Sequence, residues 1–431
     1  MNSVSRRQCL AYSVLWTSAA ATANSTTSSS LASSPDSLDQ HGIDHLAKPL
    51  AQDHVVVAER PSTDLISDDP ALTKLPSGNL LATWTFRGTK PPEKWGNANR
   101  FQLALSSDDG GTWTRRKPLD LVNGMTFVHE GQLFLIGNRL NMKDIVITRS
   151  DDEGDTWLPL VTLFEGTYWN VPSGVAMANG QLYRAFSSPT EDFVFAKTVV
   201  VAADLSRDLL DPRTWRISNA VPFPGQPDNL RRQSYPEGVI PYDFGSHWLE
   251  PNVIHVRGRL MVLHRVRIAT YATTNMCGVC DLEDDGTTLS LQFTQFFPMP
   301  GGHHKFHILY DEPSRLFWTP VNLSTDGQNS LNNHQELRRK GYHSGMGNER
   351  RLLMLYYSLD GLNWFQACCL AMSRNPMQSF MYPGPLIDGD DLLVLARTSI
   401  NGQNQHDADL VTFHRLPDFR SLALPLYPEL A

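Results

Sequence analysis

One short pattern occurs six times along this 431-residue chain, and it constrains the fold more than any other feature. Each copy is a polar turn followed at once by a stretch of aliphatic, β-branched or aromatic residues. The six turns occupy residues 76–80, 130–133, 179–182, 257–260, 312–316 and 388–392. A polar turn between two apolar stretches predicts a β-hairpin, and a hairpin that recurs predicts a repeat architecture.

A third apolar stretch follows five of the hairpins, and no long helical period interrupts the series. These third stretches lie at residues 101–105, 144–148, 198–202, 352–356 and 409–413. The apolar stretch at 53–58 has no hairpin of its own, and we expect it to supply the outer strand of the sixth sheet, which leaves few edges exposed. The sequence therefore predicts an all-β, six-bladed β-propeller over residues 51–431, with four-stranded antiparallel blades and an N-terminal strand that closes the last blade.

A second motif, Ser-x-Asp-x-Gly-x-Thr-Trp, follows some of the third stretches. It is complete at residues 106–113 and 150–157 and shortened by one residue at 358–364. In such a turn the Ser and Asp side chains bond backbone amides, Gly allows a positive φ, and Trp packs between neighbouring blades. We therefore expect these aspartates to be structural and not catalytic.

Such turns are known as Asp-boxes. Together with the six-fold repeat, they make the chain after about residue 50 resemble a divergent member of the sialidase (neuraminidase) superfamily. The resemblance implies an active site at one end of the propeller, where the innermost strands begin. It also implies three arginines on a substrate carboxylate, a Tyr nucleophile assisted by a Glu, and an Asp acid/base. Glu250, Arg265 and Tyr382 match the positions of the family's Glu, one of its arginines and its Tyr.

Two positions depart from the family pattern. The first inner strand should carry an Arg two residues before its Pro, but Asp68 and Asp69 precede Pro70. The acid/base Asp is expected after the second strand of the first blade, where residues 87–100 contain no Asp and Glu93 is the only acid. Glu93, His303 and His304 are therefore candidate replacements for the missing acid.

Further polar residues cluster at the predicted strand heads. Cationic side chains that converge on one cavity would favour an anionic substrate group, and Trp169 or Trp248 could stack on a sugar. The candidate substrate-binding residues are Arg265, Arg397, Lys305, Arg87, Asp68, Asp69, Trp169, Asn170, Arg231 and Tyr235. A hydrogen-bonded structural role is the alternative for each His, and a solvated loop is the alternative for Arg231.

The charge and the N-terminus bear on partners and location. A formal net charge of -8 opposes a nucleic-acid partner, which would require a basic face. Residues 1–23 combine Arg6-Arg7 with a mildly apolar stretch and fit a twin-arginine export signal, so a periplasmic or secreted protein is expected. Residues 24–50, rich in Ser and Thr, are interpreted as a flexible segment, and no later apolar stretch is long enough for a membrane span.

The cysteines do not predict a metal site. Cys277 and Cys280 have zinc-knuckle spacing but lack a second pair, and adjacent Cys368 and Cys369 cannot easily share one ion. Buried strand cysteines or a disulfide are the expected alternatives. No cofactor is expected.

Three functions remain compatible with the sequence. The first is an exported glycoside hydrolase of exo-sialidase type, which cleaves an acidic sugar from an oligosaccharide, glycoconjugate or polysaccharide. In that mechanism Tyr382 attacks the anomeric carbon, Glu250 takes its proton, and Arg265 and Arg397 hold the carboxylate. The second is a polysaccharide lyase on uronate-containing glycans, and the third is a glycan-binding propeller without turnover.

Overall fold

The computed structural model describes residues 48–88, 100–190, 196–225, 247–267, 275–325, 349–402 and 404–426. All six predicted hairpins form. Three of them turn through two residues that both have positive φ, namely Glu130-Gly131, Asn179-Gly180 and Arg257-Gly258. This is the type I′ geometry, whose twist matches that of the flanking strands.

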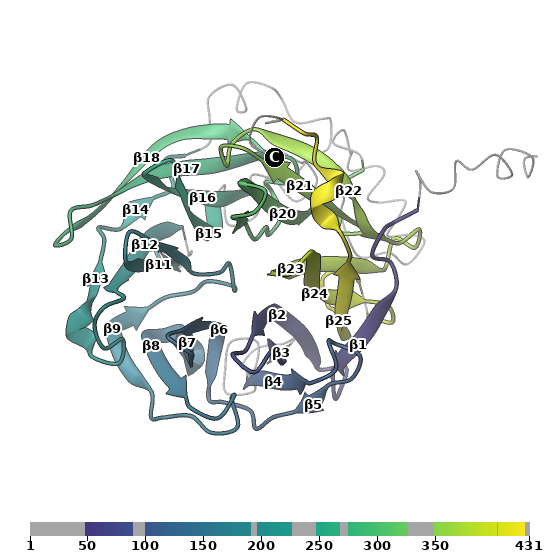
Figure 1. Ribbon diagram of the computed structural model, residues 1–431, viewed down its shortest axis with the longest axis horizontal. Coiled ribbons are helices and arrows are strands. Elements are labelled where there is room, and N and C mark those ends of the chain that lie inside the picture. Colours follow the sequence, from purple (N-terminus) through teal and green to yellow (C-terminus); the bar gives the residue numbers. More distant parts are fainter. Residues whose placement is uncertain are drawn as a thin grey trace, which may run out of the picture. The chain divides into compact units, whose positions relative to one another are not determined.

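Within residues 49–431 the strands form six antiparallel sheets arranged in a ring (Figure 1). From inside to outside, the first blade contains β2 (Leu65–Lys74), β3 (Leu80–Gly88), β4 (Arg100–Ser106) and β5 (Thr114–Arg115). The second contains β6 (Leu121–His129), β7 (Gln132–Arg139), β8 (Lys143–Ser150) and β9 (Val161–Thr167). The third contains β10 (Ala176–Ala178), β11 (Gln181–Ser188), β12 (Lys197–Asp204) and β13 (Trp215–Ile217), and β14 (Val221–Pro222) pairs with β12. The fourth contains β15 (His247–Val256), β16 (Arg259–Arg267), β17 (Met276–Asp284) and β18 (Leu289–Pro298). The fifth contains β19 (Leu309–Asp311), β20 (Leu316–Asn322), β21 (Leu352–Ser358) and β22 (Trp364–Met372). Short 3-10 helices lie at η3 (Leu140–Met142), η4 (Pro212–Thr214) and η6 (Phe419–Leu422).

The sixth blade is closed by the N-terminal strand, as predicted. It contains β23 (Ser379–Asp388), β24 (Asp391–Ser399), β25 (Leu410–Leu416) and, outermost, β1 (His54–Glu59). The register of β1 against β25 runs from His54 opposite His414 to Glu59 opposite Leu410. Pairing two distant segments in one sheet covers an edge that would otherwise be open.

The core lies largely between neighbouring blades. One cluster joins Leu72 and Trp84 of the first blade to Leu393 and Phe413 of the sixth, and another joins the second and third blades. Because each sheet packs on both faces, its strands are apolar on both sides, which explains the nearly continuous hydrophobic runs in the sequence.

The predicted Ser-x-Asp turns have the hydrogen bonds expected of them. In the first, Ser106 Oγ accepts from Gly110 N at 2.8 Å, and Asp108 accepts from Thr112 N at 2.8 Å. Gly110 has a φ of +90°, and a Cβ there would lie 2.3 Å from the Phe413 ring of the adjacent blade. The same hydrogen bonds recur at residues 150–156, so these aspartates are structural turn residues.

The four described cysteines are free thiols. Cys277 and Cys280 both lie on β17 but belong to different core clusters, so their spacing places the two sulfurs on opposite faces of the strand. No group of His, Cys, Asp or Glu in the described part of the chain could hold a metal ion. Over the same residues, no helix has the length and apolar character needed to cross a membrane.

Candidate active site

The inner strands of four blades carry a bulge at which one residue adopts a positive φ. These residues are Asp69 (+52°), Asn123 (+54°), Glu250 (+54°) and Tyr382 (+50°). Proline follows three of them, as Pro70, Pro251 and Pro383, and proline is tolerated at a bulge because no ladder hydrogen bond is required there. A bulge changes the direction of a side chain, and here the same bulge carries a different functional group in each of the four blades.

The structure brings Tyr382, Glu250 and Arg265 together from the sixth and fourth blades. Tyr382 Oη donates a hydrogen bond to Glu250 Oε1 at 2.9 Å. Arg265 Nη1 lies 2.9 Å from both carboxylate oxygens of Glu250 and 3.2 Å from Tyr382 Oη. The side chains of Glu250 and Arg265 are 0% and 1% exposed, so this ion pair is shielded from water.

The Tyr382 phenol is protonated at neutral pH. Burial raises its pKa, and the Glu250 carboxylate raises it further, while nearby arginines act in the opposite direction. Its proton already points at a carboxylate oxygen, which is the geometry required for a general base.

Two more arginines flank the Tyr382 ring. The guanidinium carbons of Arg397 and Arg350 lie 5.1 Å and 5.5 Å from the ring centroid. Arg350 was not predicted as a site residue, because it precedes β21 in a charged run that resembles a solvated loop, yet it is 2% exposed. Burial lowers the pKa of Arg350 to about 9, which still leaves it charged at neutral pH.

Asp68 pairs with two guanidinium groups. Arg87 Nε and Arg397 Nη1 donate to its two carboxylate oxygens. Although burial alone would raise it, these arginines lower the pKa of Asp68 to about 2. Asp68, where the family resemblance expects a positive charge, therefore holds Arg397 beside Tyr382.

Asp69 faces the site without a hydrogen bond. The residue is 7% exposed, and no described residue donates to its carboxylate. Burial raises the pKa of Asp69 well above its ordinary value, and the negative charges of Asp68 and Glu250 add to this effect. Arg87 and Arg397 oppose the increase.

Lys305 lies among the same groups. It is 2% exposed, and its Nζ donates to the carbonyl oxygen of Pro383, next to Tyr382. Burial lowers the pKa of Lys305 to about 7, although Glu250 and Asp69 favour its charged form.

The two candidate histidines are buried and turn toward one serine. His303 Nε2 and His304 Nε2 lie 3.1 Å and 3.4 Å from Ser324 Oγ. Burial and the nearby Arg265 lower the pKa of His303 to about 3, so its ring is neutral and is not a proton donor of the imidazolium type. Its carbonyl oxygen accepts from Arg265 Nε at 2.7 Å, which fixes that arginine.

The remaining described candidates differ in their surroundings. Asn170 is fully buried and donates to the carbonyls of Ala185 and Pro251, so it supports the bulge that carries Glu250. Trp169 packs against the small apolar cluster that contains Tyr382. Trp248 is 0% exposed and stacks on His264, so it is not available to a sugar and that prediction is wrong.

Three predicted residues, Glu93, Arg231 and Tyr235, lie outside the described residues.

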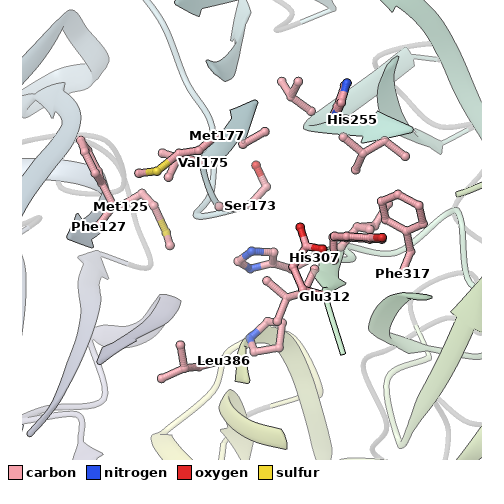
Figure 2. A pocket seen from close by; sticks show the side chains of 18 of the residues that line it. Met125, Phe127, Ser173, Val175, Met177, His255, His307, Glu312, Phe317 and Leu386 are labelled. Carbon is pink, nitrogen blue, oxygen red and sulfur yellow. The ribbon is translucent and has the colours of Figure 1, made fainter. Parts of the chain in front are cut away.

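A separate cavity of about 950 Å³ opens farther along the same inner strands. Apolar side chains such as Met125, Phe127 and Val175 line much of it, and Figure 2 shows them on one side of His307. The lining contains neither Tyr382 nor Glu250, because on these strands it begins two or three residues after the residue with positive φ. The ionic site and this apolar cavity are therefore different regions of the propeller.

Solved structures with the same fold include enzymes. The Trypanosoma rangeli sialidase in complex with sialic acid is 13% identical, with a TM-score of 0.53 over 87% of this chain and 60% of its own. The chain has the sialidase-type propeller fold. The α-L-arabinofuranosidase Arb93A of Fusarium graminearum in complex with an iminosugar inhibitor is 12% identical, with a TM-score of 0.50 over 85% of this chain and 98% of its own.

A protein of unknown function from Dyadobacter fermentans has the same sialidase-type fold. It is 12% identical, with a TM-score of 0.53 over 86% of this chain and 98% of its own. No protein-family model and no curated protein sequence matches this chain.

Proposed function

We propose that this sialidase-type propeller is a glycoside hydrolase that removes a terminal, carboxylate-bearing sugar through a covalent intermediate on Tyr382. The observation that carries the proposal is the buried hydrogen bond from Tyr382 Oη to Glu250 Oε1 at 2.9 Å, with Arg265 Nη1 on both groups. In the first step Tyr382 Oη bonds to the anomeric carbon as Glu250 takes the phenol proton, and the bond to the leaving oxygen breaks. Water then displaces the tyrosine, which recovers its proton from Glu250.

The arginines support an anionic substrate. Arg265 Nη2, Arg350 Nη1 and Arg397 Nε are buried and have no hydrogen-bond partner among the described residues. Buried donors are normally satisfied, and a carboxylate is the acceptor that guanidinium groups bind best. A fold shared with a sialidase and an α-L-arabinofuranosidase also supports action on a sugar. We further infer that residues 1–23 export the enzyme, which comparison of the mature N-terminus with the encoded one would test.

The mechanism can be tested with fluorinated glycosyl fluorides of sialic and uronic acids, which trap a covalent intermediate. We expect the label on Tyr382, detected by peptide mass spectrometry. Tyr382→Phe should abolish labelling and lower turnover on the order of 10⁴-fold or more, and Glu250→Gln should lower turnover about 10²- to 10⁴-fold. Tyr310→Phe, at an exposed tyrosine of β19, is the matched control and should change neither.

Two outcomes would contradict the proposal. Full turnover by Tyr382→Phe would exclude this nucleophile. Unsaturated, ultraviolet-absorbing sugar ends from a uronate polysaccharide would instead indicate a lyase, for which the buried Lys305, with its pKa lowered to about 7 by burial, offers a neutral amine base.

A further inference from the structure

The proposed hydrolysis needs a second proton transfer that Glu250 cannot perform. While Glu250 removes the proton of Tyr382, another group must give a proton to the leaving oxygen. His303 is a poor donor because burial keeps its imidazole neutral, with a pKa of about 3. The aspartates of the Ser-x-Asp turns are bonded into their own loops.

Asp69 occupies the same bulge position in the first blade as Glu250 in the fourth and Tyr382 in the sixth. The bulges of the first and sixth blades touch, since a Cβ at Gly384 would lie 2.5 Å from the carbonyl oxygen of Pro70. Asp69 and Tyr382 thus lie at bulges of neighbouring inner strands, and these bulges contact each other.

The neighbouring side chains provide a second link between these two blades. Arg397 binds Asp68, the residue before Asp69, and its guanidinium carbon is 5.1 Å from the centroid of the Tyr382 ring. Asp69 therefore lies between two residues, Asp68 and Pro70, that are both linked to the sixth blade near Tyr382.

The Asp69 carboxyl has the properties of a proton donor. It is 7% exposed and has no hydrogen-bond donor among the described residues, whereas its neighbour Asp68 has two. An unpaired carboxylate is poorly stabilised when buried, so the protonated form is favoured. Burial, Asp68 and Glu250 accordingly raise the pKa of Asp69 well above its ordinary value.

Positive groups also surround Asp69 and keep it able to ionise. Arg87 and Arg397 lower its pKa. The charge of Asp69 in turn raises the pKa of Lys305, in the fifth blade, and of Arg184, in the third, although burial lowers both. A residue that must hold a proton and then release it needs both influences.

We propose that Asp69 is the general acid/base of this enzyme, in place of the loop aspartate that the sequence lacks. This inference rests on the proposed function. Asp69 donates its proton to the glycosidic oxygen as the bond between that oxygen and the anomeric carbon breaks. Its carboxylate then removes a proton from the water that attacks the anomeric carbon, while Glu250 returns the other proton to Tyr382.

The test compares leaving groups. Asp69→Asn should lower kcat/KM at least 10²-fold on a substrate with an alkyl leaving group, but less than about 10-fold on one with a dinitrophenyl group, which leaves without a proton. Asp69→Ala should show the same contrast, and added azide should restore its turnover by forming the glycosyl azide. Asp120→Asn, at an acid whose side chain is 73% exposed, is the control and should behave as the wild type.

The outcomes separate this inference from the proposed function. If Tyr382→Phe is inactive but both Asp69 variants lose activity equally on all leaving groups, or retain it, Asp69 is not the acid. If Glu93→Gln instead shows the dependence on the leaving group, the acid is Glu93 and the inference is overturned. If Tyr382→Phe is fully active, the proposed function itself fails.

Discussion

Replacing Lys305 with methionine should stabilise the protein, and by more at low pH than at high pH. Lys305 is 2% exposed, and burial lowers its pKa from 10.5 to about 7. The folded state therefore binds fewer protons at this site than the unfolded state between about pH 7 and pH 10.5. Since the unfolded state binds more protons there, the free energy of unfolding of the wild type rises with pH over that interval.

The magnitude follows from the same two pKa values. Each pH unit of difference is worth about 1.4 kcal/mol, so below pH 7 the buried ammonium costs about 5 kcal/mol relative to a group that does not titrate. At pH 9 the remaining cost is about 2 kcal/mol. Methionine has a similar volume, and loss of the hydrogen bond to Pro383 would subtract about 1 kcal/mol at either pH. The gain at pH 6 should therefore exceed the gain at pH 9 by about 3 kcal/mol.

Urea denaturation of the wild type and Lys305→Met at pH 6 and pH 9 measures this difference. Lys117→Met, at an exposed lysine, is the matched control and should change the free energy of unfolding by less than about 0.5 kcal/mol at both pH values. An equal gain for Lys305→Met at the two pH values would refute a buried, titrating amine. We also expect this variant to lose activity, because Lys305 interacts with Glu250 and Asp69.

Three other perturbations test the architecture around the site. Asp68→Asn should destabilise the protein by about 3 kcal/mol, since it removes the carboxylate that neutralises the buried guanidiniums of Arg87 and Arg397. The stability due to Asp68 is present above its ordinary pKa of 3.8 and is lost as the pH falls toward 2, so in acid melts the wild type and variant should converge. Gly384→Ala should cost about 1–3 kcal/mol and reduce activity, because the new Cβ would meet the Pro70 carbonyl, and thermal melting with a kinetic assay checks both. Deletion of His54–Glu59 should expose β25 and cause aggregation measurable by light scattering, and light scattering equal to that of the wild type would contradict a closing role for β1.

The fold could be predicted because its signals are local and repeated. Each hairpin turn, such as Asn179-Gly180, can be recognised from a few neighbouring residues, and six similar signals reinforce one another. The closing strand at 53–58 could also be predicted, since an apolar stretch without a hairpin needs a partner. These predictions are confirmed by the sheet order and by the pairing of β1 with β25.

The site was harder to predict because side-chain direction depends on a bulge. From the strand period alone, Asp68 and Asp69 point to opposite faces, and the sequence does not show which one reaches the centre. Asp69 has a positive φ at a bulge, and that bulge lies against the sixth blade, a long-range contact that the local sequence does not show. Arg350 was missed for a related reason: it lies outside the hairpin pattern, and its burial depends on long-range contacts with residues such as Gln405.

The repeated bulge also explains how the backbone of a blade can stay the same while the side chain that it presents changes. A non-glycine residue with positive φ costs on the order of 1–3 kcal/mol, and the structure retains this conformation at equivalent positions of four blades. If the conformation served the backbone alone, glycine or asparagine would suffice, as Asn123 does in the second blade. Instead the other three positions carry an aspartate, a glutamate and a tyrosine, each followed by a proline that the bulge tolerates. Under the proposed mechanism, exchanging the residue at such a position changes a reacting group while the sheet that holds it remains the same, so a propeller of this kind would acquire a different acid, base or nucleophile without refolding.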